Sequence, residues 1–207
     1  MCSITKLKLD TIPKKDYQYI VAIGTSTGGP KALNTIITAL DKRLSATYII
    51  VQHMPKGFTK SLSDRLDHLS HIQVKEAEEG DVLSQGVAYI APGGKQLKII
   101  NDQKPSIEIS DEPAYKGHKP SVNIMYESLA KLKTSKKILA IIMTGMGTDG
   151  LEGIIALKKK ENTVVIAQNE ESCVVYGMPK AVVNEGLADY IVPVDKIVET
   201  IERLMGE

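Results

Sequence analysis

The sequence of 207 residues lacks features that define several classes of protein. It contains only two cysteines, Cys2 and Cys173, which are too far apart for a disulfide framework and fit a reducing compartment. Its longest purely apolar run, Ile138 to Met143, is far too short to cross a bilayer. Residues 1–16 contain no apolar signal-peptide segment. These absences predict a soluble, cytoplasmic protein that does not insert into a membrane.

An excess of charge of either sign is also missing. There are 26 lysine and arginine residues against 25 aspartate and glutamate residues, so the formal net charge is +1. No long basic run is present, and no nucleic-acid partner is therefore expected. The sequence shows no internal repeat or low-complexity tract. The partner of this protein has to be inferred from its functional site.

The sequence contains enough apolar residues to form a complete hydrophobic core. The hydrophobic content is 43%, and the length suits a single domain. Residues 1–16 are polar, basic and interrupted by proline, which predicts a linker or lead-in. Residues 17–207 are predicted to form the folded domain.

Apolar runs and amphipathic segments alternate along this domain. The pattern predicts strands at 19–23, 47–51, 138–143, 163–167 and 190–192, and helices at 31–40, 58–69, 121–132, 151–159, 176–185 and 194–205. Such alternation is typical of a doubly wound α/β domain with a mainly parallel central sheet and helices on both faces. A more fragmented region of short strands and turns begins at 72–74. Short apolar runs at 87–91, 97–100 and 106–109, separated by turn residues, predict an additional antiparallel meander.

Three reactive side chains lie in loops that follow predicted strands. Ser26 stands in Gly24-x-Ser26-x-Gly28 between a strand and a helix, which fits the nucleophile-elbow pattern. His53 and Asp149 follow two other strands. Ligand sites in open parallel sheets lie beyond the carboxyl ends of the strands, so these side chains should meet there. Serine, histidine and aspartate are the residue types of a hydrolytic triad.

Each of the three residues also has a plainer interpretation. The loop of Ser26 could be an ordinary glycine-rich connection or an anion cradle at a helix N-terminus. Asp149 could cap the helix that follows it, and His53 could satisfy loop carbonyls. Delivery of all three by independent strand ends favours the triad.

Two other functional classes remain open at this stage. A nucleotide-binding module is one, because Gly145-x-Gly147-x-x-Gly150 follows a strand and opens a helix, with Glu170 at about the spacing of a ribose-binding acid. Against it, Asp149 would direct a carboxylate at the phosphates. A non-catalytic receptor-binding adaptor is the other, and it would leave an intact triad unexplained.

The remaining histidines fit the site less well. His68 and His71 lie at the polar end of a predicted helix, where a solvated face explains them, and no third strong ligand supports a metal site. His118 follows no strand and is interpreted as a loop residue or a contact to substrate. We therefore expect neither a metal nor another cofactor. An ordinary α/β-hydrolase is excluded because its histidine comes last in the chain.

Several motifs in register resemble the chemotaxis receptor methylesterase family, CheB, over about Tyr19 to Leu204. They are Gly24 to Pro30, Gln52 to Thr59, Lys75 to Glu78, Tyr89 to Gly93, Thr144 to Gly150, Ala167 to Glu170 and Ser172 to Pro179. The resemblance implies hydrolysis of glutamate methyl esters on the cytoplasmic helices of methyl-accepting receptors, with a related deamidation of receptor glutamines. Ser26, His53 and Asp149 match the triad positions of that family.

The resemblance also points to Met146, whose backbone N–H can face an oxyanion after the turn at Gly145 and Gly147. Met54, Met146 and Met178 all fall in the predicted site loops. They could mould to a receptor helix or simply fill the core.

The sequence departs from the family pattern in three respects. The segment 116–119 lacks an expected arginine pair, and Asn123 replaces an acidic residue. A receiver domain usually precedes the esterase domain in this family, and 16 residues are fewer than the roughly 50 that a domain needs. We therefore expect activity without a phosphodonor. If the natural protein is longer, a receiver domain should lower that activity until phosphorylated.

Overall fold

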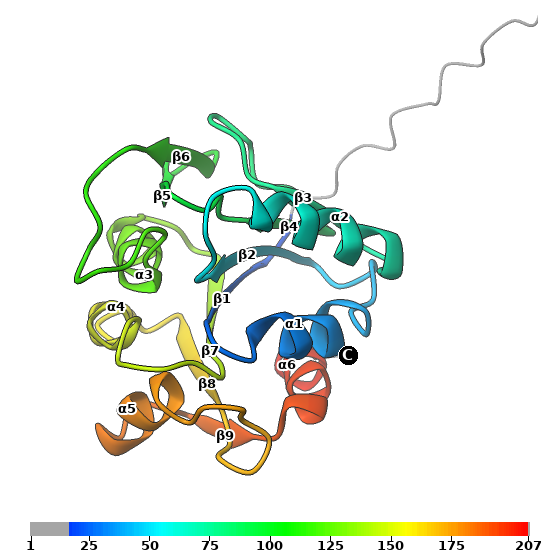
Figure 1. The fold of residues 1–207 in the computed structure, drawn as a ribbon. Helices are drawn as coiled ribbons and strands as arrows, with labels where there is room; N and C mark the ends of the chain where they lie inside the picture. The colour runs from blue at the N-terminus through cyan, green and yellow to red at the C-terminus, as the bar shows by residue number, and fades with distance from the viewer. Residues whose placement is uncertain (1–16, 207) are drawn as a thin grey trace, which may run out of the picture.

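The computed structural model describes residues 17–206, so the lead-in predicted for residues 1–16 lies outside the described residues. The main sheet has seven strands in the order β3-β4-β2-β1-β7-β8-β9, and every neighbouring pair is parallel (Figure 1). The strands are β1 (Tyr19–Thr25), β2 (Ala46–Gln52), β3 (Gln73–Glu76), β4 (Val87–Ile90), β7 (Lys137–Ile142), β8 (Thr163–Gln168) and β9 (Tyr190–Val192).

Helices cover both faces of this sheet (Figure 1). One face is covered by α1 (Gly29–Ile37), α2 (Phe58–Leu69) and α6 (Ile197–Met205), the last preceded by a short 3₁₀ turn, η1 (Val194–Lys196). The other face is covered by α3 (Val122–Lys131), α4 (Leu151–Leu157) and α5 (Met178–Asn184). The predicted doubly wound α/β fold is confirmed.

The central strands are apolar throughout because both of their faces are covered. All seven residues of β1 are buried, with Ile20 and Ala22 in one core and Val21 and Ile23 in the other. An amphipathic strand would alternate apolar and polar residues, whereas a strand buried on both faces reads as one apolar run.

The antiparallel part of the structure is smaller than predicted. The strands β5 (Gln96–Ile100) and β6 (Ser106–Ser110) form a two-stranded antiparallel sheet. The prediction that 87–91 joins this meander is wrong, because β4 pairs in parallel with β2 and β3. All four residues of β4 are buried, so its local pattern carries no information about its direction.

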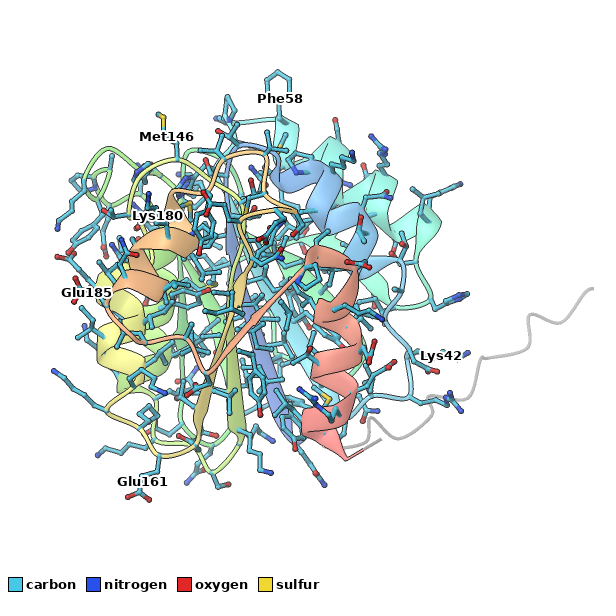
Figure 2. All side chains as sticks on the ribbon, turned by 90° about the horizontal axis from the view of Figure 1, so that it is seen from below. Lys42, Phe58, Met146, Glu161, Lys180 and Glu185 are labelled. Carbon is cyan, nitrogen blue, oxygen red and sulfur yellow. The ribbon has the colours of Figure 1, made fainter. Side chains whose placement is uncertain are left out.

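The carboxyl ends of the parallel strands gather the site loops at one end of the molecule. Figure 2 shows Met146 and Phe58 at this end and Glu161 at the opposite end. The transition from β1 to α1 is tight, since Gly28 (φ 84°) caps the helix in a left-handed conformation and Pro30 occupies its first turn. Among the helices described, none has the length and apolar character needed to span a bilayer.

Candidate active site

Ser26 and His53 leave neighbouring strands at the same level. The last residues of β1 and β2, Thr25 and Gln52, are register partners, so the next residue of each strand begins a site loop. The N–H of His53 donates to Thr25 O (3.1 Å), and the N–H of Ser26 donates to Thr144 O (2.9 Å). Ser26 is half-buried. Parallel pairing alone therefore brings these two residues to one edge.

Asp149 reaches the same place from the loop after β7. Its Oδ2 lies 2.7 Å from His53 Nε2, and the two side chains are only 2% and 12% exposed. The other ring nitrogen, His53 Nδ1, is buried and has no hydrogen-bond partner among residues 17–206. The structure thus joins His53 and Asp149 directly and leaves Nδ1 as the nitrogen able to accept a proton.

The Asp149 carboxylate also closes the N-terminus of α3. Its oxygens accept from Ser121 Oγ (2.8 Å), Val122 N (2.7 Å) and Asn123 N (3.1 Å). Burial by itself raises the pKa of Asp149, but the hydrogen bonds from His53 and from the helix N–H groups outweigh it and hold that pKa below its ordinary value. Asp149 is therefore a carboxylate at neutral pH.

The interpretation that Asp149 caps its own following helix is wrong. That role belongs to Asn123, whose Oδ1 accepts from both Gly150 N and Gly153 N at 2.9 Å. The residue in which the sequence departs from the family pattern thus links the start of α3 to the start of α4.

The nucleotide-binding alternative is not supported. A phosphate would need free N–H groups at the start of α4, but Asn123 already occupies two of them. The buried Asp149 carboxylate would repel it as well. Glu170, the proposed ribose ligand, is an exposed residue in the turn after β8.

A buried threonine that the sequence analysis missed holds three site loops together. Thr144 Oγ1 donates to Thr27 O (2.8 Å) and accepts from Val174 N and Val175 N, both at 3.1 Å. The side chain of Gln52 supports the same region, since its Nε2 donates to Ser26 O (2.9 Å). Gln52 and Thr144 each stand at the end of a buried apolar run, and this position is the signal that could have identified them as supports of the site loops.

The loop proposed to bind an oxyanion is pinned by backbone hydrogen bonds. Gly145 O accepts from Gly177 N (3.0 Å) and Met178 N (2.8 Å). The side chain of Met146 is 72% exposed, whereas Met178 is fully buried and Met54 packs against the core. For Met178 the core-filling interpretation holds, and Met146 is the exposed methionine of the three.

His118 lies closer to the site than the sequence indicated. Its ring stacks on that of His53, with centroids 4.2 Å apart and planes inclined by 9°. Burial, followed by the neighbouring His53, lowers the pKa of His118, and the opposing effect of Asp149 is smaller. His68 and His71 are exposed, as expected for a solvated face.

The donor atoms of His53, His118 and Asp149 lie within 4.8 Å of one another, which is a possible metal-binding group. Its geometry does not favour a metal. Stacked rings direct their in-plane lone pairs alongside each other, whereas a tetrahedral ion needs them to converge. The Asp149 oxygens are already engaged by hydrogen bonds.

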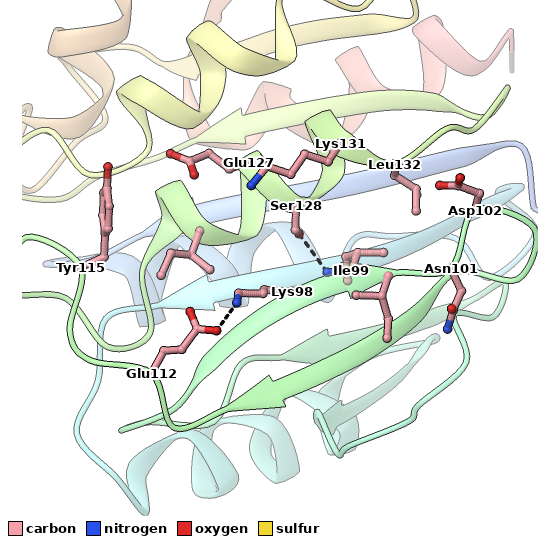
Figure 3. A pocket seen from close by; sticks show the side chains of 12 residues that line it. Lys98, Ile99, Asn101, Asp102, Glu112, Tyr115, Glu127, Ser128, Lys131 and Leu132 are labelled. Carbon is pink, nitrogen blue, oxygen red and sulfur yellow. Dashed lines mark hydrogen bonds and ion pairs between the residues drawn. The ribbon is translucent and has the colours of Figure 1, made fainter.

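One hollow on the described surface lies away from these residues. It is a groove of about 500 Å³ between β5 and α3 (Figure 3). Ile99 N donates to Ser128 Oγ there (2.8 Å), and Lys98 pairs with Glu112. The groove contains charges of both signs but no nucleophile paired with a base, so the strand-end site remains the candidate.

The doubly wound parallel sheet thus carries Ser26, His53 and Asp149 at its carboxyl edge, and these are the residue types of a hydrolytic triad. The comparisons identify the family: the CheB methylesterase family matches residues 21–201, and the chain belongs to it.

Individual relatives agree with this assignment. The chain is 51% identical over 192 residues to a protein-glutamate methylesterase/protein-glutamine glutaminase of Geobacillus kaustophilus, covering 92% of this chain and 54% of that protein. It is 49% identical over 183 residues to the Bacillus subtilis protein of the same name, covering 88% and 51%. The chain spans about half the length of the curated relatives it matches.

The solved structure of the Thermotoga maritima CheB methylesterase catalytic domain is also similar. The TM-score is 0.85 at 44% sequence identity, and the match covers 89% of this chain and 97% of that chain.

Proposed function

We propose that this chain hydrolyses methyl esters of glutamate side chains on chemotaxis receptors and deamidates receptor glutamines. The observation that carries this proposal is the pairing of His53 with the buried Asp149 beside Ser26, at the carboxyl edge of the sheet. Membership of the CheB methylesterase family supports the substrate class. The partners are the cytoplasmic helices of methyl-accepting receptors.

In the first half of the reaction, Ser26 Oγ attacks the ester carbonyl carbon while His53 Nδ1 takes its proton. Asp149 keeps the proton on Nε2 and stabilises the imidazolium. The tetrahedral oxyanion accepts a hydrogen bond from the backbone N–H of Met146. Collapse of the intermediate breaks the carbon–oxygen bond, and the imidazolium protonates the departing methanol.

In the second half, water replaces the alcohol. His53 accepts a proton from the water as it attacks the glutamyl ester of Ser26, and then returns a proton to Ser26 Oγ. The product is a glutamate side chain. With a glutamine substrate the same steps release ammonia in place of methanol.

The test is incubation of the chain with a methylated receptor fragment, followed by intact-mass analysis. We expect the mass of the fragment to fall by one CH2 unit for each ester hydrolysed, because a hydroxyl group replaces the methoxy group and methanol is released. A fluorophosphonate probe should label Ser26. Unchanged substrate mass together with no labelling would overturn the proposal. Labelling of Ser26 without turnover of the receptor fragment would show a reactive serine whose substrate is not the receptor ester, and would overturn the proposed substrate class.

A further inference from the structure

The 111–120 loop, which joins β6 to α3, carries His118 to the side of the His53 ring. Its centre is a tight turn in which Tyr115 N donates to His118 O (3.0 Å) and His118 N donates to Tyr115 O (2.9 Å). The two residues between them, Lys116 (φ 49°) and Gly117 (φ 88°), have the positive φ angles that such a two-residue turn requires. The position of the His118 ring is therefore set by a defined turn.

One anchor of this loop is buried at its base. Gln96 is fully buried, and its Nε2 donates to His118 O (3.0 Å) and to Pro113 O (3.2 Å). At the surface, Asp111 accepts from Lys95 (2.8 Å) and Lys119 (2.9 Å), and these hydrogen bonds hold the pKa of Asp111 at about 2.

A second anchor comes from α4. The two oxygens of Glu152 accept from Tyr115 Oη (2.9 Å) and Lys116 Nζ (2.7 Å). Glu152 belongs to α4 and Gln96 to β5, so two separate elements hold this loop. Glu152 is not hydrogen-bonded to His53 or His118 in the described structure, so it offers a way to loosen the turn without changing the stacked rings.

We propose that His118 is a positioning residue, whose stacked ring holds the His53 imidazole with Nε2 on Asp149 and Nδ1 turned to the nucleophile. The proposal rests on the ester hydrolysis proposed above. A ring held by one hydrogen bond can pivot about it, and a second ring 4.2 Å away with its plane inclined by only 9° blocks that motion. Small misplacements of a base are costly in rate.

The stack also keeps water from one face of His53. Hollows of about 250 Å³ and about 280 Å³ flank it, and both are lined in part by His118. The charged or titratable groups that line them are the two histidines themselves, Asp149, Glu152, Lys116 and Lys119. Because its pKa is lowered, His118 stays neutral at pH 7 and places no positive charge beside the base.

The test compares His118→Ala, which removes the ring, with His118→Phe, which keeps a flat ring without nitrogen atoms. For His118→Ala we expect kcat to fall about 10- to 100-fold while KM changes less than about twofold. The acid limb of kcat/KM should move to higher pH, because water then solvates the imidazolium of His53. His118→Phe should recover most of the lost kcat.

The second readout does not depend on turnover. Nitrogen-15 NMR of labelled histidine should show His53 as the Nε2–H tautomer in the unmodified chain and in His118→Phe, and as a mixture of tautomers in His118→Ala. If the unmodified chain hydrolyses no ester, the proposed function fails, but this measurement still tests the positioning role.

If His118→Ala does not fold, Glu152→Ala tests the same proposal, because it removes the hydrogen bonds that hold Tyr115 and Lys116. It should shift the acid limb in the same direction but less, whereas Glu199→Ala, which removes an exposed ion pair on α6, should leave the limb unmoved. A His118→Ala enzyme with kcat within about twofold of the unmodified chain and one tautomer at His53 would overturn the proposal. So would reduced activity with an unshifted limb and an unchanged tautomer, because His118 would then contact substrate.

Discussion

His53 meets Asp149 through Nε2, at 2.7 Å, and this contact determines which nitrogen is the base. In the serine-protease template the carboxylate holds Nδ1, and Nε2 accepts the serine proton. Here the two nitrogens exchange these positions, and Nδ1 is the one left without a partner among the described residues. Since Nδ1 is bonded to Cγ, it lies nearer the backbone of His53, which suits a serine in the loop that follows the adjacent strand.

Ser26→Ala is expected to abolish ester hydrolysis while the fold is retained, because the residue is half-buried in a loop and its hydroxyl lies outside the core. Methanol release measures the activity, and thermal unfolding measures the fold. Ser61→Ala, the same change at an exposed position on α2, is the matched control and should match the unmodified chain. Turnover near that of the unmodified chain in Ser26→Ala would remove Ser26 from the nucleophile role.

Asp149→Asn should lower kcat about 10⁴-fold, the loss that the same change causes in the serine-protease template. An amide has one acceptor oxygen in place of two, so some of the donors around it are left unsatisfied, at about 1–3 kcal/mol of stability. Ser121→Ala is the comparison, because it removes one hydrogen bond to Oδ1 and keeps the charge. It should cost less than about tenfold in kcat; an equal loss in both variants would mean that the charge is unimportant.

Asn123→Ala is expected to lower the free energy of unfolding by about 1–2 kcal/mol, because two N–H groups of α4 lose their acceptor. Asn123→Asp keeps an acceptor at a helix N-terminus and should lose less than half as much, despite the nearby Asp149 carboxylate. Urea unfolding followed by circular dichroism measures both. Equal losses would show that the hydrogen bonds from Gly150 and Gly153 contribute little.

Gly145→Ala should impair both stability and turnover. A Cβ at this position would lie 2.3 Å from Met178 Sδ and 2.8 Å from Ser26 Cβ, so the serine must move. We expect a loss of about 100-fold in kcat/KM and of about 1–3 kcal/mol in stability. Gly186→Ala controls for the loss of glycine, since no atom lies within 4 Å of its Cβ; its φ of 66° costs about 1 kcal/mol without affecting turnover.

Stability should fall as the pH is lowered, in two ranges. The pKa of His118 is lowered in the fold, so the unfolded chain binds this proton more readily, and stability is lost as pH drops below the ordinary value of 6.5. The lowered pKa of Asp149 gives a further loss below about its ordinary value of 3.8. Urea midpoints measured against pH should show a shallower first decline in His118→Phe. An unchanged decline would contradict the assignment to His118.

Much of the site followed from where apolar runs end. The run before Ser26, the run before His53 and the run before Asp149 are all buried strands, and parallel pairing places their carboxyl ends at one edge. That inference needs only the pattern of burial and the rule that parallel strands point the same way.

His118 could not be placed from the sequence, for a physical reason. Its position depends on Gln96, Asp111 and Glu152, which come from three separate segments and have no periodic relation to it. The parallel pairing of β4 was missed for a related reason, since a short run buried on both faces does not encode its direction. The choice of Nε2 for Asp149 is likewise set by how the loops pack.

The Asp149 carboxylate is hydrogen-bonded both to His53 and to the start of α3. Selection for activity and selection for stability therefore both act on this side chain. A descendant that no longer needed catalysis could exchange Ser26 freely, since the core does not depend on that hydroxyl. It could not exchange Asp149 as freely, because the buried N-terminus of α3 would lose its acceptor. Inactive members of such a lineage should therefore keep the aspartate after the serine has drifted, and a retained aspartate alone is weak evidence of activity.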